Sequence, residues 1–128
     1  MPKFDQIVTQ IKKYNQARGW DSVAEDYAKS IMIEAAELLE IFQWDVSDNK
    51  PHDNLSYKDH KEISFEAADI FIYLIDFCDK ANINLLEAVE EKLKYLEKKY
   101  PVEMFQGKHN EEEYIKRKKE YRLNKVKS

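Results

Sequence analysis

The sequence predicts an all-α protein, with a four-helix bundle-like core followed by a C-terminal helical tail. Only two glycines and three prolines occur in 128 residues, so long helices joined by short loops are favoured. Apolar side chains recur at spacings of three and four residues, and polar capping motifs precede several of these stretches. A chain of this length is large enough for one domain with its own core. Together these features are typical of a small helical bundle.

The first helix is expected from about Lys3 to Ala17, with Gly19 just past its end as a C-cap. Its apolar stripe is Phe4, Ile7, Val8, Ile11 and Tyr14. The second helix is expected after Ser22, where Ser-Val-Ala-Glu resembles a capping box, and continues to about Trp44. Its stripe is Ile31, Ala35, Leu38 and Phe42, with Glu34 and Glu37 at the edge.

Residues 45–56 are rich in turn formers and predict a loop. A second capping motif, Ser-Tyr-Lys-Asp at 56–59, opens a third helix that is expected to reach about Lys80. Between residues 67 and 78 this helix is apolar nearly all round, apart from Asp69 and Asp76. Such a helix is central or is covered by a second subunit.

A fourth helix is expected after Asn84 and should end at Tyr100-Pro101. Its stripe is Leu85, Val89, Leu93 and Leu96. A further, weakly amphipathic helix is expected over residues 111–123. We therefore divide the chain into a domain over residues 1–107 and a basic, partly helical tail over residues 108–128.

Charge is distributed unevenly along the chain. Residues 108–128 hold eight Lys and Arg against four Glu, a net charge of +4, which leaves −8 for residues 1–107. An acidic body repels nucleic-acid phosphates and attracts cations, so we expect no nucleic-acid partner. The simplest interpretation of the basic tail is a solvated charge run.

Location is suggested by three features. No apolar stretch approaches the roughly 18 residues of a membrane span, and the N-terminus lacks the apolar segment of a signal peptide. The lone Cys78 lies in an apolar helical stretch, which is typical of a buried thiol in a reducing compartment. We expect a cytoplasmic protein with no membrane association.

Two pairs of acids lie where the chain is otherwise most apolar. Glu34 and Glu37 lie within Ile-Glu-Ala-Ala-Glu-Leu-Leu (33–39), and Glu66 and Asp69 lie within Phe-Glu-Ala-Ala-Asp-Ile-Phe (65–71). Spacing of three residues puts both members of a pair on one helix face, about 5–6 Å apart at Cβ. Acids are rarely buried unless they are paired or bind a metal. Two such pairs on two packed helices therefore indicate a four-carboxylate metal site.

The donor set favours a hard cation. Oxygen ligands suit Mg²⁺ or Mn²⁺, whereas a di-iron site would need Glu-x-x-His, which none of the three histidines provides. A single acid pair is also typical of an ordinary solvated helix surface, and five other glutamates are interpreted so: Glu40, Glu62, Glu87, Glu90 and Glu91. Burying four carboxylates without a cation would cost several kcal/mol each. From the residues alone, a metal site and a solvated surface are about equally supported.

These acid pairs and the segments around them resemble a known family, the MazG-like all-α nucleoside triphosphate pyrophosphohydrolases, close to the dCTP pyrophosphatase branch. The resemblance is carried by Glu-x-x-Glu (34–37), an interval of 28 residues and Glu-x-x-Asp (66–69). Glu-Leu-Leu-Glu-Ile-Phe-Gln-Trp (37–44), Asp-Ile-Phe-Ile-Tyr (69–73) and Lys-Tyr-Pro (99–101) also resemble family segments. The resemblance covers about residues 1–105 and is far more specific than either acid pair.

The resemblance implies hydrolysis of a nucleoside triphosphate between its α- and β-phosphates, with Mg²⁺, or Mn²⁺, held by Glu34, Glu37, Glu66 and Asp69. It also implies a nucleotide-pool housecleaning role, with a pyrimidine such as dCTP as substrate. The implied substrate-binding residues are Trp20, Trp44, Tyr73 and Lys92. Lys29, five residues before Glu34, is a weaker candidate to contact the phosphates. For Trp44 core packing is an equal alternative, and for Lys29 an ordinary surface lysine is the simpler interpretation.

One departure from the family pattern concerns Leu96, which stands where many relatives carry Asn, so substrate choice is open. The apolar third helix, in particular Phe71, Ile72, Leu74 and Ile75, together with the resemblance, predicts a homodimer or homotetramer. Two other classes of function remain open: a non-catalytic nucleotide- or protein-binding module with a structural metal, and a bare scaffold bundle. Loss of buried acids would leave the stability of a bare scaffold unchanged or improve it.

Overall fold

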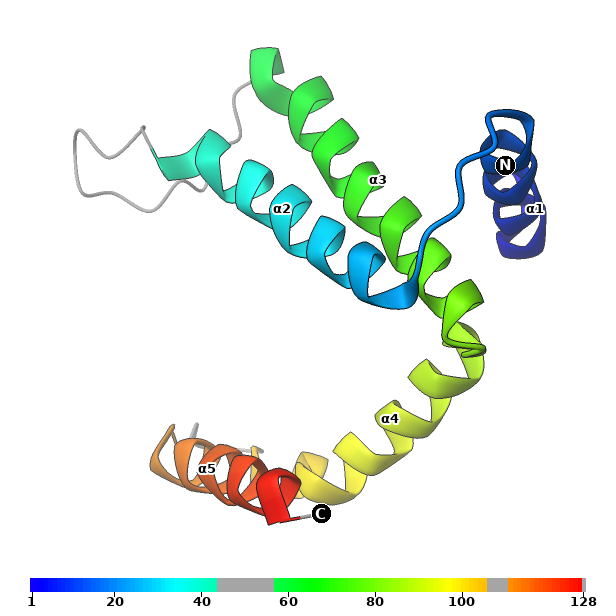
Figure 1. Ribbon diagram of the computed structural model, residues 1–128. Coiled ribbons are helices and arrows are strands. Elements are labelled where there is room, and N and C mark those ends of the chain that lie inside the picture. Colours follow the sequence, from blue (N-terminus) through cyan, green and yellow to red (C-terminus); the bar gives the residue numbers. More distant parts are fainter. Residues whose placement is uncertain (44–56, 106–110, 128) are drawn as a thin grey trace. The chain divides into compact units, whose positions relative to one another are not determined.

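The computed structural model describes residues 1–43, 57–105 and 111–127, and the regular elements among them are all helical (Figure 1). They are α1 (Phe4–Ala17), α2 (Ala24–Gln43), α3 (Tyr57–Lys80), α4 (Leu85–Lys99), the 3₁₀ turn η1 (Val102–Met104) and α5 (Glu111–Lys127). The predicted all-α class is confirmed. The chain forms two compact units, Met1–Asn84 and Leu85–Ser128. The domain boundary that we expect after residue 107 stays a prediction.

The helix boundaries agree closely with the sequence pattern. Helix α1 ends at Ala17, and Gly19 adopts the left-handed conformation with φ of +62°. In this turn the Gly19 amide donates to the Gln16 carbonyl at 3.1 Å, and the Trp20 amide donates to the Asn15 carbonyl at 3.0 Å. A left-handed residue that closes a helix in this way is most easily glycine. The turn reverses the chain and brings Trp20 back toward the helix that it follows.

Helices α2 and α3 lie side by side and run in opposite directions (Figure 1). The α3-facing side of α2 is its less exposed side and includes Ile31, Glu34, Leu38 and Ile41. Ala35, which we expected in this stripe, is exposed because it lies about 100° around the helix from Glu34. Glu34 therefore lies within the packed face of α2 and not at its edge. The predicted loop over residues 45–56, including the cap at Ser56, lies outside the described residues.

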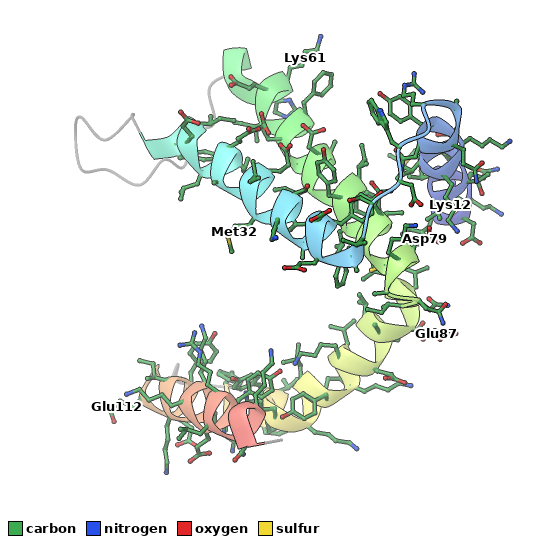
Figure 2. The ribbon with its side chains drawn as sticks, in the orientation of Figure 1. Lys12, Met32, Lys61, Asp79, Glu87 and Glu112 are labelled. Carbon is green, nitrogen blue, oxygen red and sulfur yellow. The ribbon has the colours of Figure 1, made fainter. Side chains whose placement is uncertain are left out.

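Helix α1 packs on α3 through three kinds of contact. The rings of Phe4 and Phe71 meet edge to face at a centroid distance of 6.2 Å. The Asn15 side chain donates to the Asp76 carboxylate at 2.8 Å, and Lys12 Nζ lies 3.0 Å from Asp79 Oδ1 (Figure 2). Among the described residues the buried apolar side chains are Ile11, Ile75 and Cys78. The predicted burial of Cys78 is confirmed.

Some of the α3 side chains that we expected a second subunit to cover are covered within the chain itself. Ile75 is only 4% exposed, so the expectation that it needs a second subunit to cover it is wrong. Phe71 and Ile72 remain 38% and 37% exposed. In the part of the chain that the structure describes, no helix is long and apolar enough to cross a membrane.

The second unit packs α5 on α4 mainly through aromatic rings. Tyr95 meets Tyr121 at a centroid distance of 5.8 Å, and Tyr100 meets Tyr114 at 5.6 Å. The Arg117 guanidinium donates to the backbone carbonyl of Lys99, the last residue of α4. Helix α5 extends to Lys127, beyond the expected end at residue 123. The basic segment thus contacts the preceding helix through tilted tyrosine pairs and the Arg117 hydrogen bond.

Candidate functional site

Three of the four predicted metal ligands meet between α2 and α3. Each of Glu34, Glu37 and Glu66 offers a carboxylate oxygen, and these oxygens lie within 4.8 Å of one another. Asp69 lies one turn beyond Glu66 on α3 and is not part of this closest group. It is near enough to raise the pKa of both Glu34 and Glu66 through like-charge repulsion. The structure thus gathers the four acids at one place on the α2–α3 hairpin.

This cluster is electrostatically unfavourable as it stands. Glu34 Oε2 and Glu66 Oε2 are buried and have no hydrogen-bond partner. Burial is the main cause that raises the pKa of Glu34 to about 7, and the adjacent Glu37 carboxylate raises it further. Burial also raises the pKa of Glu66, and the charge of Glu37 raises it further. Buried oxygen atoms without a hydrogen-bond partner, beside other carboxylates, are what a bound cation would stabilise.

The donor chemistry restricts which cation fits. Within the described ranges the closest group contains only carboxylates, without a histidine or a cysteine. Hard divalent cations such as Mg²⁺ and Mn²⁺ prefer oxygen ligands, whereas zinc and iron sites use imidazole or thiolate more often. The residues present therefore fit a hard divalent metal ion.

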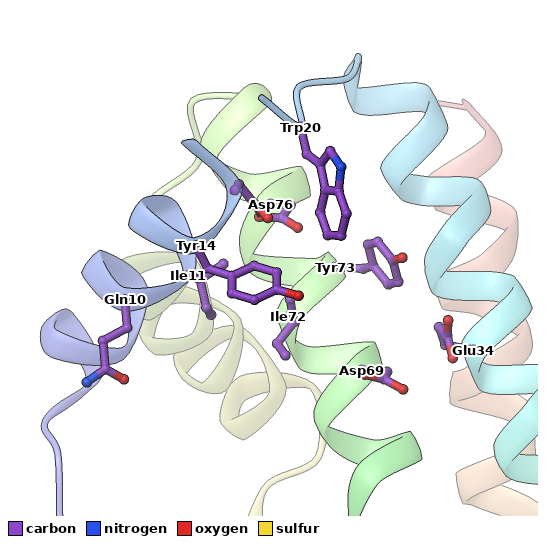
Figure 3. A pocket seen from close by; sticks show the side chains of 10 residues that line it. Gln10, Ile11, Tyr14, Trp20, Glu34, Asp69, Ile72, Tyr73 and Asp76 are labelled. Atoms are coloured by element: carbon purple, nitrogen blue, oxygen red, sulfur yellow. Dashed lines mark hydrogen bonds between the residues drawn. The ribbon is translucent and has the colours of Figure 1, made fainter. Parts of the chain in front are cut away.

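A cavity of about 560 Å³ opens next to the acids, between α1, the Gly19 turn, α2 and α3. Figure 3 shows Glu34 and Asp69 at one end and Trp20 with Asp76 at the other, with Tyr73 between them. The volume lies in the range of small-molecule sites. Burial, and then the Glu34 charge, raise the pKa of the Tyr73 hydroxyl, so Tyr73 remains a neutral donor close to the acids.

Trp20 reaches the cavity because of the chain reversal at Gly19. Its ring meets the Tyr14 ring edge to face at a centroid distance of 5.7 Å. The Arg18 guanidinium lies 3.6 Å from the centroid of the Tyr14 ring. Trp20 is still 60% exposed, so its indole is available to a flat ligand. The wall beside Trp20 is thus aromatic, as a site for a nucleobase requires.

The far end of the cavity holds a second buried acid. Asp76 is 8% exposed, and its Oδ1 accepts a hydrogen bond from Asn15 Nδ2 at 2.8 Å. Sequence reasoning assigned no site role to Tyr14, Asn15 or Asp76, although all three line the cavity. The signal available for Asp76 was its place as one of two acids in the apolar stretch 67–78.

The other predicted substrate-binding residues are Lys29, Lys92 and Trp44. Lys29 pairs with Glu25 at 3.3 Å on the exposed side of α2. Lys92 belongs to the second unit, where its ammonium donates to the Tyr121 hydroxyl and lies 5.0 Å from the Tyr95 ring centroid. Trp44 lies outside the described residues. The structure thus brings together the four acids, Trp20 and Tyr73.

Fold and site define a class: an all-α protein with a carboxylate cluster on a helical hairpin beside a cavity with aromatic walls. The profile of the MazG-like family matches residues 29–117, and the chain belongs to the MazG-like family. A pyrophosphatase from Archaeoglobus fulgidus has a similar crystal structure, with a TM-score of 0.61 and 34% identity. That match covers 79% of this chain and 94% of the archaeal one.

Two curated mammalian relatives are more distant. The chain is 24% identical to dCTP pyrophosphatase 1 of Bos taurus over 108 residues and 26% identical to that of Mus musculus over 109 residues. Each alignment covers 83% of this chain and 64% of the relative. The chain thus spans slightly less than two thirds of the length of these relatives.

Proposed function

We propose that this protein is a Mg²⁺-dependent nucleoside triphosphate pyrophosphohydrolase. The observation that carries the proposal is a group of three carboxylates within 4.8 Å, two of them with unpartnered buried oxygens, beside a cavity of nucleotide-binding size. The names of the similar proteins, a pyrophosphatase and two dCTP pyrophosphatases, support the same reaction.

The proposed ligands of the metal are Glu34, Glu37, Glu66 and Asp69. A divalent cation there supplies positive charge that neutralises the triphosphate and activates water. In the reaction, a water oxygen bonds to the α-phosphorus while the bond from that phosphorus to the α,β-bridging oxygen breaks. A carboxylate oxygen of the cluster accepts the proton of the attacking water. The products are a nucleoside monophosphate and pyrophosphate.

The cavity supplies the groups that position the nucleoside. Trp20 offers an exposed indole face for stacking on the base, and Tyr73 offers a neutral hydroxyl next to the acids. Lys92, and Trp44 beyond the described residues, stay as proposals for the phosphates and the base. Lys29 is already paired with Glu25 and is not carried into this proposal. Deoxynucleoside triphosphates, with a pyrimidine such as dCTP first, are the proposed substrates in cytoplasmic nucleotide-pool housecleaning.

The test is pyrophosphate release from a panel of the canonical ribonucleoside and deoxynucleoside triphosphates, with Mg²⁺ and with EDTA. We expect turnover only with the metal and loss of turnover in Glu37→Gln or Asp69→Asn. Glu40→Gln is the matched control, because Glu40 is an exposed acid on α2 that is not part of the closest acid group. Turnover in EDTA, or full activity of Glu37→Gln, would contradict the proposal.

A non-catalytic binding module is the second candidate, and the observation that favours it is Leu96. The family resemblance implies Asn at this position of α4, whereas this chain has the apolar Leu96 there. A binding module predicts nucleotide-dependent thermal shifts in Mg²⁺ without pyrophosphate release. Measuring both properties on the same sample distinguishes the two functions.

We also propose that the protein works as a homodimer or homotetramer. Phe71 and Ile72 keep 38% and 37% of their surface exposed, and Phe65 on the same helix is 62% exposed. Apolar surface on such a helix is typical of a subunit interface. Light scattering after size exclusion should give a multiple of the 15.3 kDa chain mass, and a mass of one chain would contradict the proposal.

A further inference from the structure

We propose that Asp76 is a specificity-determining residue, which accepts a hydrogen bond from the exocyclic amino group of cytosine and so selects cytosine over uracil nucleotides. The inference rests on the proposed function and concerns the end of the cavity away from the metal ligands. It is carried by the position and burial of Asp76 and by the hydrogen bond that Asp76 accepts from Asn15.

The position of Asp76 suits contact with a base. Figure 3 shows Asp76 beside the Trp20 ring, whereas Asp69 and Glu34 lie at the opposite end of the same cavity. Asp69 and Asp76 are seven residues apart on α3, which is about 10.5 Å along the helix axis. This length is comparable with that of a nucleoside. A nucleotide whose phosphates lie at the acidic cluster therefore reaches Asp76 with the outer edge of its base.

The hydrogen bonding of Asp76 leaves it able to accept more. Its Oδ1 accepts from Asn15 Nδ2 at 2.8 Å, and an ionised carboxylate has further lone pairs on both oxygens. The charged group beside it on α3 is Asp79, which pairs with Lys12 at 3.0 Å. The carboxylate of Asp76 is thus oriented by one neutral donor and is not neutralised by the lysine that pairs with its neighbour.

The chemistry of the base then decides which nucleotide fits. A carboxylate accepts from the amino group at C4 of cytosine, a contact that also specifies cytosine in nucleic-acid recognition. Uracil carries an oxygen acceptor at C4, which would face the carboxylate oxygens without a hydrogen between them. In a buried place such an unpaired arrangement strongly disfavours the wrong ligand.

The test compares kcat/KM for dCTP and dUTP in the wild-type protein and in Asp76→Asn. The wild type should prefer dCTP by about tenfold or more, the usual effect of one good base-edge contact. Asparagine can donate to the oxygen of uracil, so Asp76→Asn should lower the ratio toward one and improve dUTP turnover. Asn15→Ala should lower the ratio in the same direction, because the carboxylate loses the donor that holds it.

Asp79→Asn is the matched control, because Asp79 also links α3 to α1 but does not line the cavity. Its ratio should stay at the wild-type value. An Asp76→Asn variant that slows dCTP and dUTP equally would show a purely structural link between helices and would overturn the inference. A wild type without preference, or an equal change in Asp79→Asn, would overturn it as well.

The proposed function and this inference can fail separately. If neither nucleotide is hydrolysed, the proposed function fails, and the affinities for dCTP and dUTP are measured by calorimetry in Mg²⁺. Tighter dCTP binding that Asp76→Asn abolishes would then support the inference. Equal affinities for the two nucleotides in the wild type would overturn it.

Discussion

Helix α3 carries acids at both ends of one cavity, Asp69 with the nearby Glu66 at one end and Asp76 at the other, and the two ends differ in how these acids are hydrogen-bonded. At one end Glu66 Oε2 and the facing Glu34 Oε2 have no hydrogen-bond partner and are surrounded by other carboxylates. At the other end Asp76 is more deeply buried, at 8% exposure, but accepts a hydrogen bond from Asn15. At both ends the acids lie within otherwise apolar stretches of sequence. Among the described residues, only at the end with the proposed metal ligands do buried carboxylate oxygens lack a hydrogen-bond donor.

The difference indicates two roles. A buried carboxylate with a neutral donor is stable by itself and can orient a ligand, as Asp76 is oriented by Asn15. Buried carboxylates that contact only each other destabilise the fold until a cation binds. Replacing Glu66 at one end and removing the donor Asn15 at the other should therefore have opposite effects on stability.

The largest effect is expected from Glu66→Gln. Loss of a metal ligand should lower kcat/KM by more than about a hundredfold, since even outer-shell partners of metal sites contribute 10–100-fold. Without metal, the same substitution should raise the melting temperature by a few degrees, because it removes one of the repelling charges and adds an amide donor. Pyrophosphate release and thermal melts in EDTA test both parts. A lower melting temperature in EDTA would contradict the comparison.

Asn15→Ala should act on stability in the opposite direction. It leaves the Asp76 carboxylate buried without its donor, which costs about 1–3 kcal/mol, or a decrease of roughly 4–10 °C in melting temperature. Lys12→Ala is the matched control, because it breaks the ion pair between Lys12 and Asp79, which joins the same two helices. The two side chains of this pair are 48% and 46% exposed. An exposed pair of this kind contributes less than about 1 kcal/mol. Equal effects of the two substitutions would contradict the distinction.

Much of this arrangement could be predicted from the sequence because it depends on helix periodicity. The i,i+3 spacing of Glu34 with Glu37 and of Glu66 with Asp69 places each pair on one face. The apolar residues around them then determine that these faces pack together. Helix ends followed the same local rules, since Gly19 and Asn84 mark boundaries that the structure confirms to within a residue.

The remainder depends on contacts between distant parts of the chain. The Asn15–Asp76 hydrogen bond joins residues 61 positions apart, and no local pattern relates them. The placement of Ala35 outside the packed face reflects the rotation of α2 against α3, which is set by the partner helix. Lys29 looked suitable by its nearness in sequence to Glu34, yet five residues turn it to another side of the helix.

The effect of pH on the metal-free protein provides a smaller test of the acidic end. Burial raises the pKa of Glu34 from 4.5 to about 7, so the folded state binds more protons than the unfolded state between these values. Stability should therefore fall as pH rises from about 4.5 through 7. Because bound Mg²⁺ favours the ionised acids, the increase in melting temperature that it causes should be larger at pH 8 than at pH 5.5. A Mg²⁺-induced increase in melting temperature that does not vary with pH would contradict this interpretation. So would a pH dependence of that increase that is unchanged in Glu34→Gln.

The smallest expected effect concerns the turn that carries Trp20 to the cavity. Gly19 has φ of +62°, and a Cβ added there meets no atom within 4 Å, so only the backbone conformation opposes an alanine. Gly19→Ala should cost about 1 kcal/mol, and it should raise KM more than it lowers kcat, because Trp20 is displaced from the base while the acids stay in place. Gly19→Asn is the conservative variant, since asparagine tolerates the left-handed conformation better, and it should retain most of the affinity. If Gly19→Ala instead lowered kcat with KM unchanged, the Trp20 end of the cavity would have to act on the reacting phosphate and not on the base.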